Sequence, residues 1–554
     1  MGRVTDENGN PLSGATVNLT GVPTATTTTD ANGGYTFGLL TVGNSYTVSV
    51  AATGYIFGSA QVNNLQKNVR RDFGPSVINI SGHVTLNASG LSGVTITLGI
   101  GGATNVQTDA SGNYAFNNLP AGRTYTVMAS KPSFQFDPQS ILFFQLLTDV
   151  QTANFVATAL PTFSFSSPSF TAAEGGGALT IPVTRGNNTS GTSTVSWAVP
   201  IETFSDAPCA EVHGKASISC DYTIITGILT FNPGETTKSF TVLINDDAYV
   251  EGNETFSMQL INPNGGAPVV GQPNTATITI TDNDTVPPTT NPIDNPNAQF
   301  FAQEHYYDFL SREPDPGGLA FWANEITSCG SNQSCIDVKR VNVSAAFFLS
   351  IEFQETGYLV YRMYKVAYGN LPGAPVPVRY NEFMPDAQQI ALGVQVGIGN
   401  WQAQLESNKA AFALAFVSRD RFMTAFPTTI TPTQFVDALY ANGGVTPDAA
   451  ERTSVINEFA GAGNTLDTAA RGRALRRVAE NSLLNQQETN RAFVLMQYFG
   501  YLRRNPNDAP EAGLDFAGYN FWLGKLNQFN GNFVNAEMVK AFINSGEYRQ
   551  RFGP

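Results

Sequence analysis

Residues 245–256 read Asn-Asp-Asp-Ala-Tyr-Val-Glu-Gly-Asn-Glu-Thr-Phe, and about one strand later residues 282–284 read Asp-Asn-Asp. Between residues 161 and 284 the chain has 3 Lys or Arg against 12 Asp or Glu, so this segment carries −9 of the formal charge of −14. Carboxylates at this density repel one another and raise each other's pKa unless a cation compensates them. Calcium suits such loops, because it takes about 6 to 8 oxygen ligands in flexible geometry. The stretch therefore predicts a calcium site.

The sequence around this stretch resembles a Calx-β domain over residues 159–284. The resemblance rests on Ala-Glu-Gly-Gly at 173–176, Ile-Pro-Val-Thr-Arg at 181–185, Cys-Asp-Tyr at 220–222, Gly-Ile-Leu-Thr-Phe at 227–231, Gly-Glu-Thr-Thr-Lys at 234–238 and Thr-Asp-Asn-Asp at 281–284. It implies a β-sandwich with cations clustered at one end. Carried over position by position, the implied ligands are Glu174, Asp221, Asp246, Asp247, Glu251, Asp282 and Asp284, with Glu254 as a further candidate. The alternative is that these residues are family framework in loops that bind no ion.

Length and composition set the remaining limits. At 554 residues the chain is too long for one core, and about 150 residues per domain predicts several units. The charged fraction is 13%, and 52 Gly and 31 Pro indicate a chain rich in strands and loops in its first half. The acidic pI near 4.7 argues against nucleic acid or an anionic membrane surface as partner. No apolar run reaches the roughly 18 residues that a membrane helix needs.

The four cysteines form two close pairs in the sequence, Cys209 with Cys220 and Cys329 with Cys335. This spacing predicts two disulfides, which require an oxidising compartment and therefore a secreted or cell-surface protein. A rival interpretation is a zinc site made by Cys209, His213 and Cys220. It supplies only three ligands, at an unfamiliar spacing.

The N-terminal part contains a tandem repeat. Residues 2–5 (Gly-Arg-Val-Thr) match residues 82–85 (Gly-His-Val-Thr), and residues 30–37 match residues 109–116, with Asp-x-x-Gly-x-Tyr-x-Phe in both. Short runs of alternating apolar and polar residues bounded by Gly, Asn, Asp and Pro predict antiparallel sandwiches. Both copies, 1–75 and 76–158, resemble carboxypeptidase-regulatory-like domains. That resemblance implies a spacer or scaffold, with Asp30 and Asp109 as turn residues.

The first repeat begins without the residues that precede Gly82 in the second, where 77–81 read Val-Ile-Asn-Ile-Ser. An opened first strand predicts a sheet edge to which another chain could add a strand. The alternative is that preceding residues are missing from this sequence. We favour that alternative, because no basic and then apolar leader begins the chain as a secreted protein would require.

After residue 284 the composition changes. Residues 285–297 predict an extended Pro-rich linker, and residues 298–554 predict a mostly α-helical domain. Thr431-Pro432 and Thr446-Pro447 each look like an N-cap followed by a first-turn proline. Residues 306–314 with Phe321-Trp322 are echoed by residues 498–506 with Phe521-Trp522. The domain resembles a helical domain of unknown function found at the ends of modular bacterial surface and extracellular proteins. Its aromatic residues are expected in the core rather than on a carbohydrate platform.

Catalytic motifs are absent from the sequence: there is no nucleophile elbow, metalloprotease helix, phosphate loop or dinucleotide fingerprint. The three histidines, His83, His213 and His305, fall in three different predicted domains. The arginines at 471, 473, 476 and 477 are explained by a solvated helix face or ion pairs. We therefore predict β-sandwiches followed by a helical domain, in a non-enzymatic extracellular structural protein that binds calcium and self-associates into filaments. The alternatives are a monomeric adhesin for a glycan or protein, and the accessory region of a secreted hydrolase.

Overall fold

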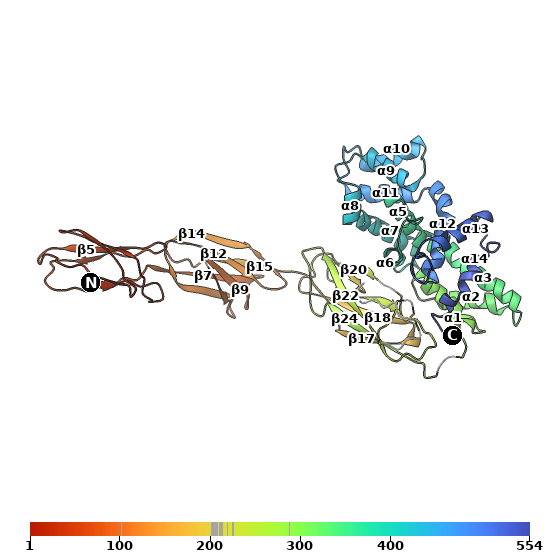
Figure 1. Cartoon of the computed structure of the whole chain (residues 1–554), viewed down its shortest axis with the longest axis horizontal. Helices are drawn as coiled ribbons and strands as arrows, with labels where there is room; N and C mark the ends of the chain where they lie inside the picture. Colours follow the sequence, from red (N-terminus) through yellow and green to blue (C-terminus); the bar gives the residue numbers. More distant parts are fainter. Residues whose placement is uncertain (101, 201–208, 210–213, 219, 224–225, 287–288) are drawn as a thin grey trace. The chain divides into compact units, whose positions relative to one another are not determined.

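The computed structural model describes residues 1–554 except 101, 201–208, 210–213, 219, 224–225 and 287–288. It divides into two compact units, residues 1–162 with 266–269 and residues 163–265 with 270–554. Figure 1 shows strands in the red-to-yellow part of the chain and helices in the green-to-blue part. The predicted fold class, β-sandwiches followed by a helical domain, is confirmed.

The first unit contains both sequence repeats. In the first repeat, β3 (Ala25–Thr28), β2 (Thr16–Thr20), β5 (Tyr46–Ala51) and β6 (Ala60–Val62) form one sheet in that order, and β1 (Gly2–Arg3) pairs with β4 (Gly34–Tyr35). In the second, β10 (Gly102–Gln107), β9 (Thr95–Ile100), β12 (Arg123–Ser130) and β14 (Ser140–Leu146) form one sheet. The other sheet orders β11 (Asn113–Pro120), β7 (Val77–Leu86), β15 (Phe155–Ala159) and β13 (Phe134–Asp137), with β8 (Ser89–Gly90) at the side of β7.

The strand registers show that the two repeats are equivalent. Gly2 pairs with Tyr35 in the first copy, and Gly82 pairs with Tyr114 in the second. A Cβ atom at Gly2 would overlap the carbonyl oxygen of Arg71, and one at Gly82 would overlap a carbonyl oxygen in the same way. Glycine stands at this position in both copies because a neighbouring backbone lies against it.

The second unit begins with a sandwich of two sheets. One orders β21 (Thr237–Leu243), β18 (Ala178–Gly186), β16 (Thr162–Phe165) and β23 (Val269–Val270). The other orders β17 (Ser169–Ala173), β24 (Thr275–Thr281), β22 (Glu254–Asn264), β19 (Ser193–Ala198) and β20 (Thr226–Phe231). Alternate residues of β22 are buried, as expected for a strand with one face in the core. The ring of Trp197 from one sheet stacks on Phe240 from the other at 3.7 Å, which joins the two layers.

The remainder of the second unit is helical. Its helices are α1 (Gln299–His305), the π-helical η4 (Tyr306–Leu310), α2 (Pro316–Thr327), α3 (Gln333–Leu349), α4 (Ile351–Glu355), α5 (Gly357–Tyr368), α6 (Tyr380–Ala391), α7 (Trp401–Val417), α8 (Asp420–Ala425), α9 (Pro432–Gly443), α10 (Ala449–Ile456), η5 (Asn457–Phe459), α11 (Thr468–Ala479), α12 (Ser482–Gly500), α13 (Ala517–Gln528), α14 (Met538–Ile543) and α15 (Gly546–Arg549). Its buried side chains and those of the sandwich form one continuous apolar cluster.

Of the two predicted helix starts, one is confirmed and one is wrong. Thr431 caps α9 by accepting from the backbone N–H of Gln434, with a proline at the first helical position. The prediction of a helix start at Thr446-Pro447 is wrong, because α10 starts at Ala449. Asp448 is the N-cap, since its carboxylate accepts from the backbone N–H of Glu451 at 2.8 Å.

The second half of the predicted linker is packed rather than extended. Asn291 is buried, and its Nδ2 donates to the carbonyl oxygens of Arg549 at 2.8 Å and Gly553 at 2.9 Å. The short 3-10 helix η3 (Pro292–Asp294) follows, with Ile293 in the apolar cluster. Residues 291–294 are therefore part of the helical region.

The echo within the helical region is a structural duplication. The segment α1–η4–turn–α2 corresponds to α12–turn–α13, and each turn carries an arginine that pairs with a later glutamate. Arg312 pairs with Glu352 at 2.6 Å, and Arg504 pairs with Glu547 at 2.5 Å. Each guanidinium also lies over a tyrosine ring of the preceding helix. Tyr306 and Tyr307 are buried, as predicted for core aromatics, whereas Phe321 and Phe521 are exposed.

Candidate functional site

Strand pairing brings the acidic loops to one end of the sandwich. The parallel pairing of β17 with β24 sets Ala173 beside Thr281, so the residues that follow each strand, Glu174 and Asp282, lie at the same edge. The antiparallel pairing of β22 with β24 sets Glu254, the first residue of β22, at this edge too. The loop 245–253 enters here after β21, because the end of β21 pairs with the start of β18.

Seven carboxylates converge in three overlapping groups. In each group the ligand oxygens lie within 4.8 Å of one another. Glu174 belongs to two of the groups and Glu251 to two, so the groups form one continuous acidic cluster. The groups are Glu174 with Asp247 and Glu251, Glu174 with Asp282 and Asp284, and Asp221 with Glu251 and Glu254.

Backbone N–H groups hold several of these carboxylates in place. Oδ2 of Asp282 accepts from the backbone N–H of Glu251 at 2.8 Å and of Gly252 at 2.7 Å. Oε1 of Glu174 accepts from the backbone N–H of Asp247 at 3.2 Å. Oδ1 of Asp282 accepts in turn from the backbone N–H of Asp284 at 2.6 Å. The loop backbone therefore preorganises these carboxylates.

The cluster is costly to ionise without a cation. Burial, followed by the neighbouring carboxylates, raises the pKa of Glu251 to about 10. The same causes raise the pKa of Asp247 to about 9 and the pKa of Glu254 to about 9. Burial is also the main cause that raises the pKa of Glu174 to about 8. These groups take up protons when no other positive charge is present.

A metal ion fits this donor set. Oδ2 of Asp247 and Oδ2 of Asp284 are buried and have no hydrogen-bond partner in the part of the chain that the structure describes. Within the same residues, no ion pair includes Glu174, Asp247 or Glu251. Unpartnered carboxylate oxygens at the centre of a buried acidic cluster are hard ligands, which suit calcium.

The structure sorts the predicted ligands into two sets. Glu174, Asp221, Asp247, Glu251, Asp282 and Asp284 lie in the three groups, together with the further candidate Glu254. Asp246 lies outside them, and its Oδ1 accepts from Nδ2 of Asn283 at 2.9 Å. Which of these residues bind an ion remains a prediction.

Sequence reasoning missed two residues that support the site. Asn245 is fully buried, and its Nδ2 donates to the carbonyl oxygen of Cys220, next to Asp221. Arg503 reaches the same segment from the helical region, at 3.2 Å from the carbonyl oxygen of Tyr222. The internal duplication could have singled out Arg503, because the equivalent position in the first copy is Ser311.

Two disulfides join Cys209 to Cys220 and Cys329 to Cys335, as predicted. The first one ties down the segment that carries Asp221. It also uses both thiols of the alternative zinc site, whose third member, His213, lies outside the described residues.

His305 is a packed residue of the helical region. It is fully buried, with Nδ1 at 2.6 Å from the carbonyl oxygen of Phe301 and Nε2 at 2.6 Å from Oγ of Ser344. Burial lowers the pKa of His305 to about 4, so it stays neutral at ordinary pH.

The four arginines of α11 are explained by local partners. Arg473 and Arg477 pair with Glu458, and Arg476 pairs with Glu406. Arg471 differs from the prediction of a solvated face or ion pairs, because it is buried and donates to the carbonyl oxygen of Phe426 and to Thr465.

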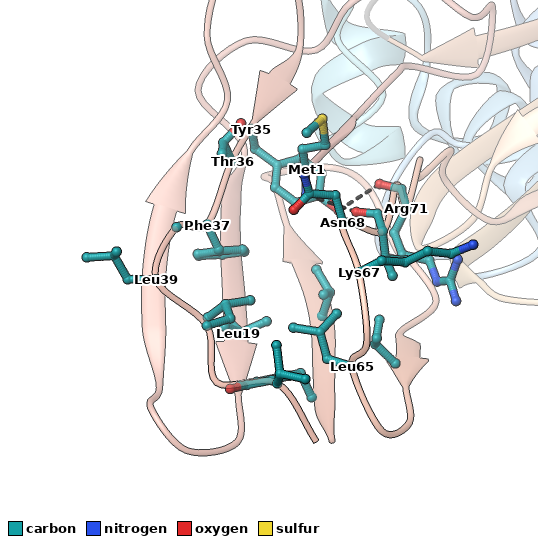
Figure 2. A pocket seen from close by; sticks show the side chains of 17 residues that line it. Met1, Leu19, Tyr35, Thr36, Phe37, Leu39, Leu65, Lys67, Asn68 and Arg71 are labelled. Carbon is teal, nitrogen blue, oxygen red and sulfur yellow. Dashed lines mark hydrogen bonds between the residues drawn. The ribbon is translucent and has the colours of Figure 1, made fainter. Parts of the chain in front are cut away.

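A pocket of about 440 Å³ opens in the first repeat, and Figure 2 shows Leu19, Phe37 and Leu65 among its lining residues. In the second repeat, Phe116, which aligns with Phe37, pairs with Ile80 of β7, and both Ile78 and Ile80 are buried. Polar residues, among them Lys67, Asn68 and Arg71, also line the pocket.

Comparison with protein families identifies the three β domains. Residues 1–72 and 79–154 match the sequence model of the carboxypeptidase regulatory-like domain, and residues 157–284 match that of the Calx-beta domain. The predicted modular organisation is confirmed by these matches, and the helical C-terminal region is consistent with it. No helix within the described residues is long and apolar enough to cross a membrane.

Curated relatives match over short stretches. Chitinase ChiA of Flavobacterium johnsoniae is 35% identical over 109 residues, which is 19% of this chain and 7% of that protein. Integrin beta-4 of Rattus norvegicus is 35% identical over 127 residues, 22% of this chain and 6% of that protein. Extracellular matrix protein 3 of Lytechinus variegatus is 31% identical over 140 residues, 24% of this chain and 4% of that protein. The matches thus span a small fraction of each relative.

Solved structures also resemble parts of the chain. The apo form of the Calx CBD1 domain is 26% identical, covering 23% of this chain and 99% of that one, with a TM-score of 0.20. BcpA, the major pilin subunit of Bacillus cereus, is 11% identical, covering 37% of this chain and 69% of that one, with a TM-score of 0.23.

Proposed function

We propose that this chain is a non-enzymatic structural protein of the cell surface or extracellular matrix, and that calcium binding at the acidic end of its Calx-beta domain makes it rigid. Glu174, Asp247 and Glu251 would hold the ion together with their neighbours in the cluster. The bound ion would supply the positive charge that these buried carboxylates lack. The chain's own backbone then fixes the loops around it through Asp282.

One observation carries this proposal. The carboxylates of Glu174, Asp247 and Glu251 are buried within 4.8 Å of one another, and in the described part of the chain no Lys or Arg forms an ion pair with them. A cluster with this charge is stable either as a protonated group or around a cation. At neutral pH and millimolar extracellular calcium, a weak calcium site of the extracellular type is occupied.

The test is calorimetric titration of the chelator-treated full chain with calcium, followed by thermal unfolding with and without calcium. Binding together with a higher melting temperature supports the proposal. Magnesium is the matched control, because it demands stricter octahedral geometry and is expected to bind more weakly. Absence of calcium binding, or an unchanged melting curve at saturating calcium, would exclude the proposed role.

Self-association into filaments is the finer part of the proposal. It is supported by the pocket in the first repeat, which is lined in part by Leu19, Phe37 and Leu65 and which an extended strand from another chain could fill. Electron microscopy of the native protein in calcium tests it: regular fibres support a filament subunit. Isolated particles would favour the second candidate, a monomeric adhesin, to be followed by glycan-binding assays.

A further inference from the structure

Arg503 joins the helical region to the calcium-site sandwich. It follows α12, is buried with 4% of its surface exposed, and has a left-handed backbone with φ of 49°. Its guanidinium donates to the carbonyl oxygens of Ile218 and Tyr222 at 3.2 Å each, and to Oγ1 of Thr223 at 3.3 Å. It also pairs with Asp308 of its own region at 3.1 Å. A rigid guanidinium fork thus holds several acceptors at once.

These acceptors belong to the Asp221 segment, which we define as residues 217, 218 and 220–223. Asp221 lies in one of the three carboxylate groups, and the carbonyl of Tyr222 is one residue beyond it. On its other side the segment is held by Asn245, whose backbone N–H donates to the carbonyl oxygen of Asp221 at 2.9 Å. The ring of Tyr222 stacks on Phe256 of β22 at 3.9 Å. The conformation of Asp221 therefore depends on contacts from both domains.

A second contact reaches another ligand loop. The hydroxyl of Tyr307 lies 3.4 Å from the carbonyl oxygen of Gly177 and donates to Oε1 of Glu313 at 2.6 Å. Gly177 comes directly after the 3-10 turn that holds Glu174 (η1, Glu174–Gly176). The helical region thus touches two segments that carry candidate calcium ligands.

The internal duplication shows that Arg503 is not required by the helix–turn–helix fold itself. The equivalent residue in the first copy is Ser311, which has the same left-handed backbone with φ of 51°. In both copies the next residue is the arginine that pairs with a glutamate, Arg312 or Arg504. The copies therefore share the turn and the ion pair, and Arg503 is an addition whose donors reach into the sandwich.

We propose that Arg503 is a positioning residue for the calcium site: docking of the helical region through Arg503 sets the conformation of the Asp221 segment and thereby strengthens calcium binding. Because coupling between two binding events is reciprocal, calcium in turn strengthens the docking. This inference rests on the proposed function. It adds that docking of the helical region regulates calcium affinity, through a residue about 280 positions after Tyr222 in the sequence.

The test is the variant Arg503→Ser in the full chain, which installs the residue of the first copy. Calorimetric titration is expected to show calcium binding weakened on the order of 10-fold, within the usual range of coupling between sites. The matched control is Arg504→Ser. It breaks the adjacent ion pair with Glu547, which lies within the helical region, and is expected to lower thermal stability while leaving the calcium dissociation constant unchanged.

Hydrogen exchange gives a second measurement, which reports on docking of the helical region to the sandwich. Hydrogen exchange of residues 217–223 and 174–177 is expected to slow on calcium addition in the wild type. In Arg503→Ser the segment 217–223 should exchange fast with or without calcium. If that variant does not fold, Arg503→Lys keeps a charge beside Asp308 but loses the fork, and it is expected to weaken calcium binding by a smaller factor.

The outcomes separate this inference from the proposed function. Wild-type calcium binding that Arg503→Ser and Arg503→Lys leave unchanged would overturn the role of Arg503 while keeping the calcium site. Equal weakening by Arg504→Ser would also overturn it, because the effect would then come from general loss of helical stability. A wild-type chain that binds no calcium would overturn both.

Discussion

Two groups of buried carboxylates in the second structural unit differ in how their charge is compensated. In the helical region Asp308 is fully buried and pairs with Arg503 at 3.1 Å and with Arg551 at 2.9 Å. In the sandwich Glu174 and Asp247 are equally buried, yet no ion pair of the described residues includes them. The chain supplies the compensating charge in the first case, and in the second case the described residues supply none.

The presence or absence of arginine partners predicts how each group of carboxylates affects stability. A carboxylate that pairs with buried arginines is held in the fold by the chain's own charges. A group that the described residues leave uncompensated is expected to make the stability of the fold depend on pH and, on the proposed function, on calcium. The comparison teaches that the lack of a Lys or Arg partner among the described residues of the acidic end is as informative as the carboxylates present there.

The largest expected effect comes from breaking the compensated group. Asp308→Asn leaves Arg503 and Arg551 buried with no ionised partner at that position, which we expect to lower the free energy of unfolding by about 3 to 5 kcal/mol. Differential scanning calorimetry measures it. The matched control is Asp437→Asn, since Asp437 forms a similar ion pair with Arg452 on the surface and should cost at most about 1 kcal/mol. Equal losses in the two variants would contradict the comparison.

The second-largest expected effect is that of calcium on the free energy of unfolding. At a concentration 100 times its dissociation constant, calcium is expected to raise the free energy of unfolding by about 2.7 kcal/mol. Asp247→Asn should then have opposite effects in the two conditions. It should stabilise the calcium-free chain by on the order of 1 kcal/mol, because the folded state no longer has to hold at this position a proton that the unfolded chain releases. It should destabilise the calcium-bound chain, because a charged ligand is lost. Urea unfolding with and without calcium measures both. The same sign in both conditions would count against an ion at this position.

The pH dependence of the calcium-free chain is the third expectation. Because the folded pKa of Glu174 is raised to about 8 and that of Asp247 to about 9, the folded state holds protons that the unfolded chain releases near pH 4. Stability is therefore expected to fall as pH rises from about 4.5 to about 9, and to be flatter with calcium bound. Melting temperatures at several pH values test this.

A matched variant isolates the acidic end in that experiment. Burial raises the pKa of Glu304 in the helical region to about 8, so it adds to the same trend. The double variant Asp247→Asn with Glu251→Gln should keep the part of the pH dependence that comes from Glu304. It should lose most of the pH dependence that comes from the acidic end. A wild-type melting temperature that rises with pH would contradict the assigned burial of these carboxyls.

The smallest effect is expected at Asp246. It lies outside the three carboxylate groups and accepts a hydrogen bond from Asn283. We therefore expect Asp246→Asn to change the calcium dissociation constant less than about threefold, against about tenfold or more for Asp247→Asn, which removes a buried ligand oxygen. Calorimetric titration of both variants gives the comparison. A larger effect at Asp246 would mean that the ion lies nearer the outer loop.

Much of the fold could be predicted because local patterns determined it. The alternating residues of β22 and the Asp-x-x-Gly-x-Tyr turns specify strands and turns through short-range chemistry. The acidic loops were predicted as a cation site because their charge density alone demands compensation. The failed helix start at Thr446 has a local cause as well, since two good capping residues stand close together and Asp448 is the N-cap in the structure.

Long-range packing accounts for what could not be predicted. Arg503 contacts a segment about 280 residues earlier in the chain, and no periodicity connects the two. In the sequence, Arg471 looks like the other arginines around it. In the structure it is buried and donates to the carbonyl oxygen of Phe426. Asp246 and Asp247 are adjacent in sequence, and only the loop backbone decides which carboxylate faces the cluster.

The clasp around Asn291 has a mechanical consequence. Its side chain ties the residue that enters the helical region to Arg549 and Gly553, and Asp294 pairs with Arg549 close by. A pull applied between residue 290 and residue 554 would load this short clasp first, and the helices between would bear little tension until it opened. In a protein anchored at a surface, the helical region would therefore unfold and lengthen under force only after these hydrogen bonds and the ion pair had broken.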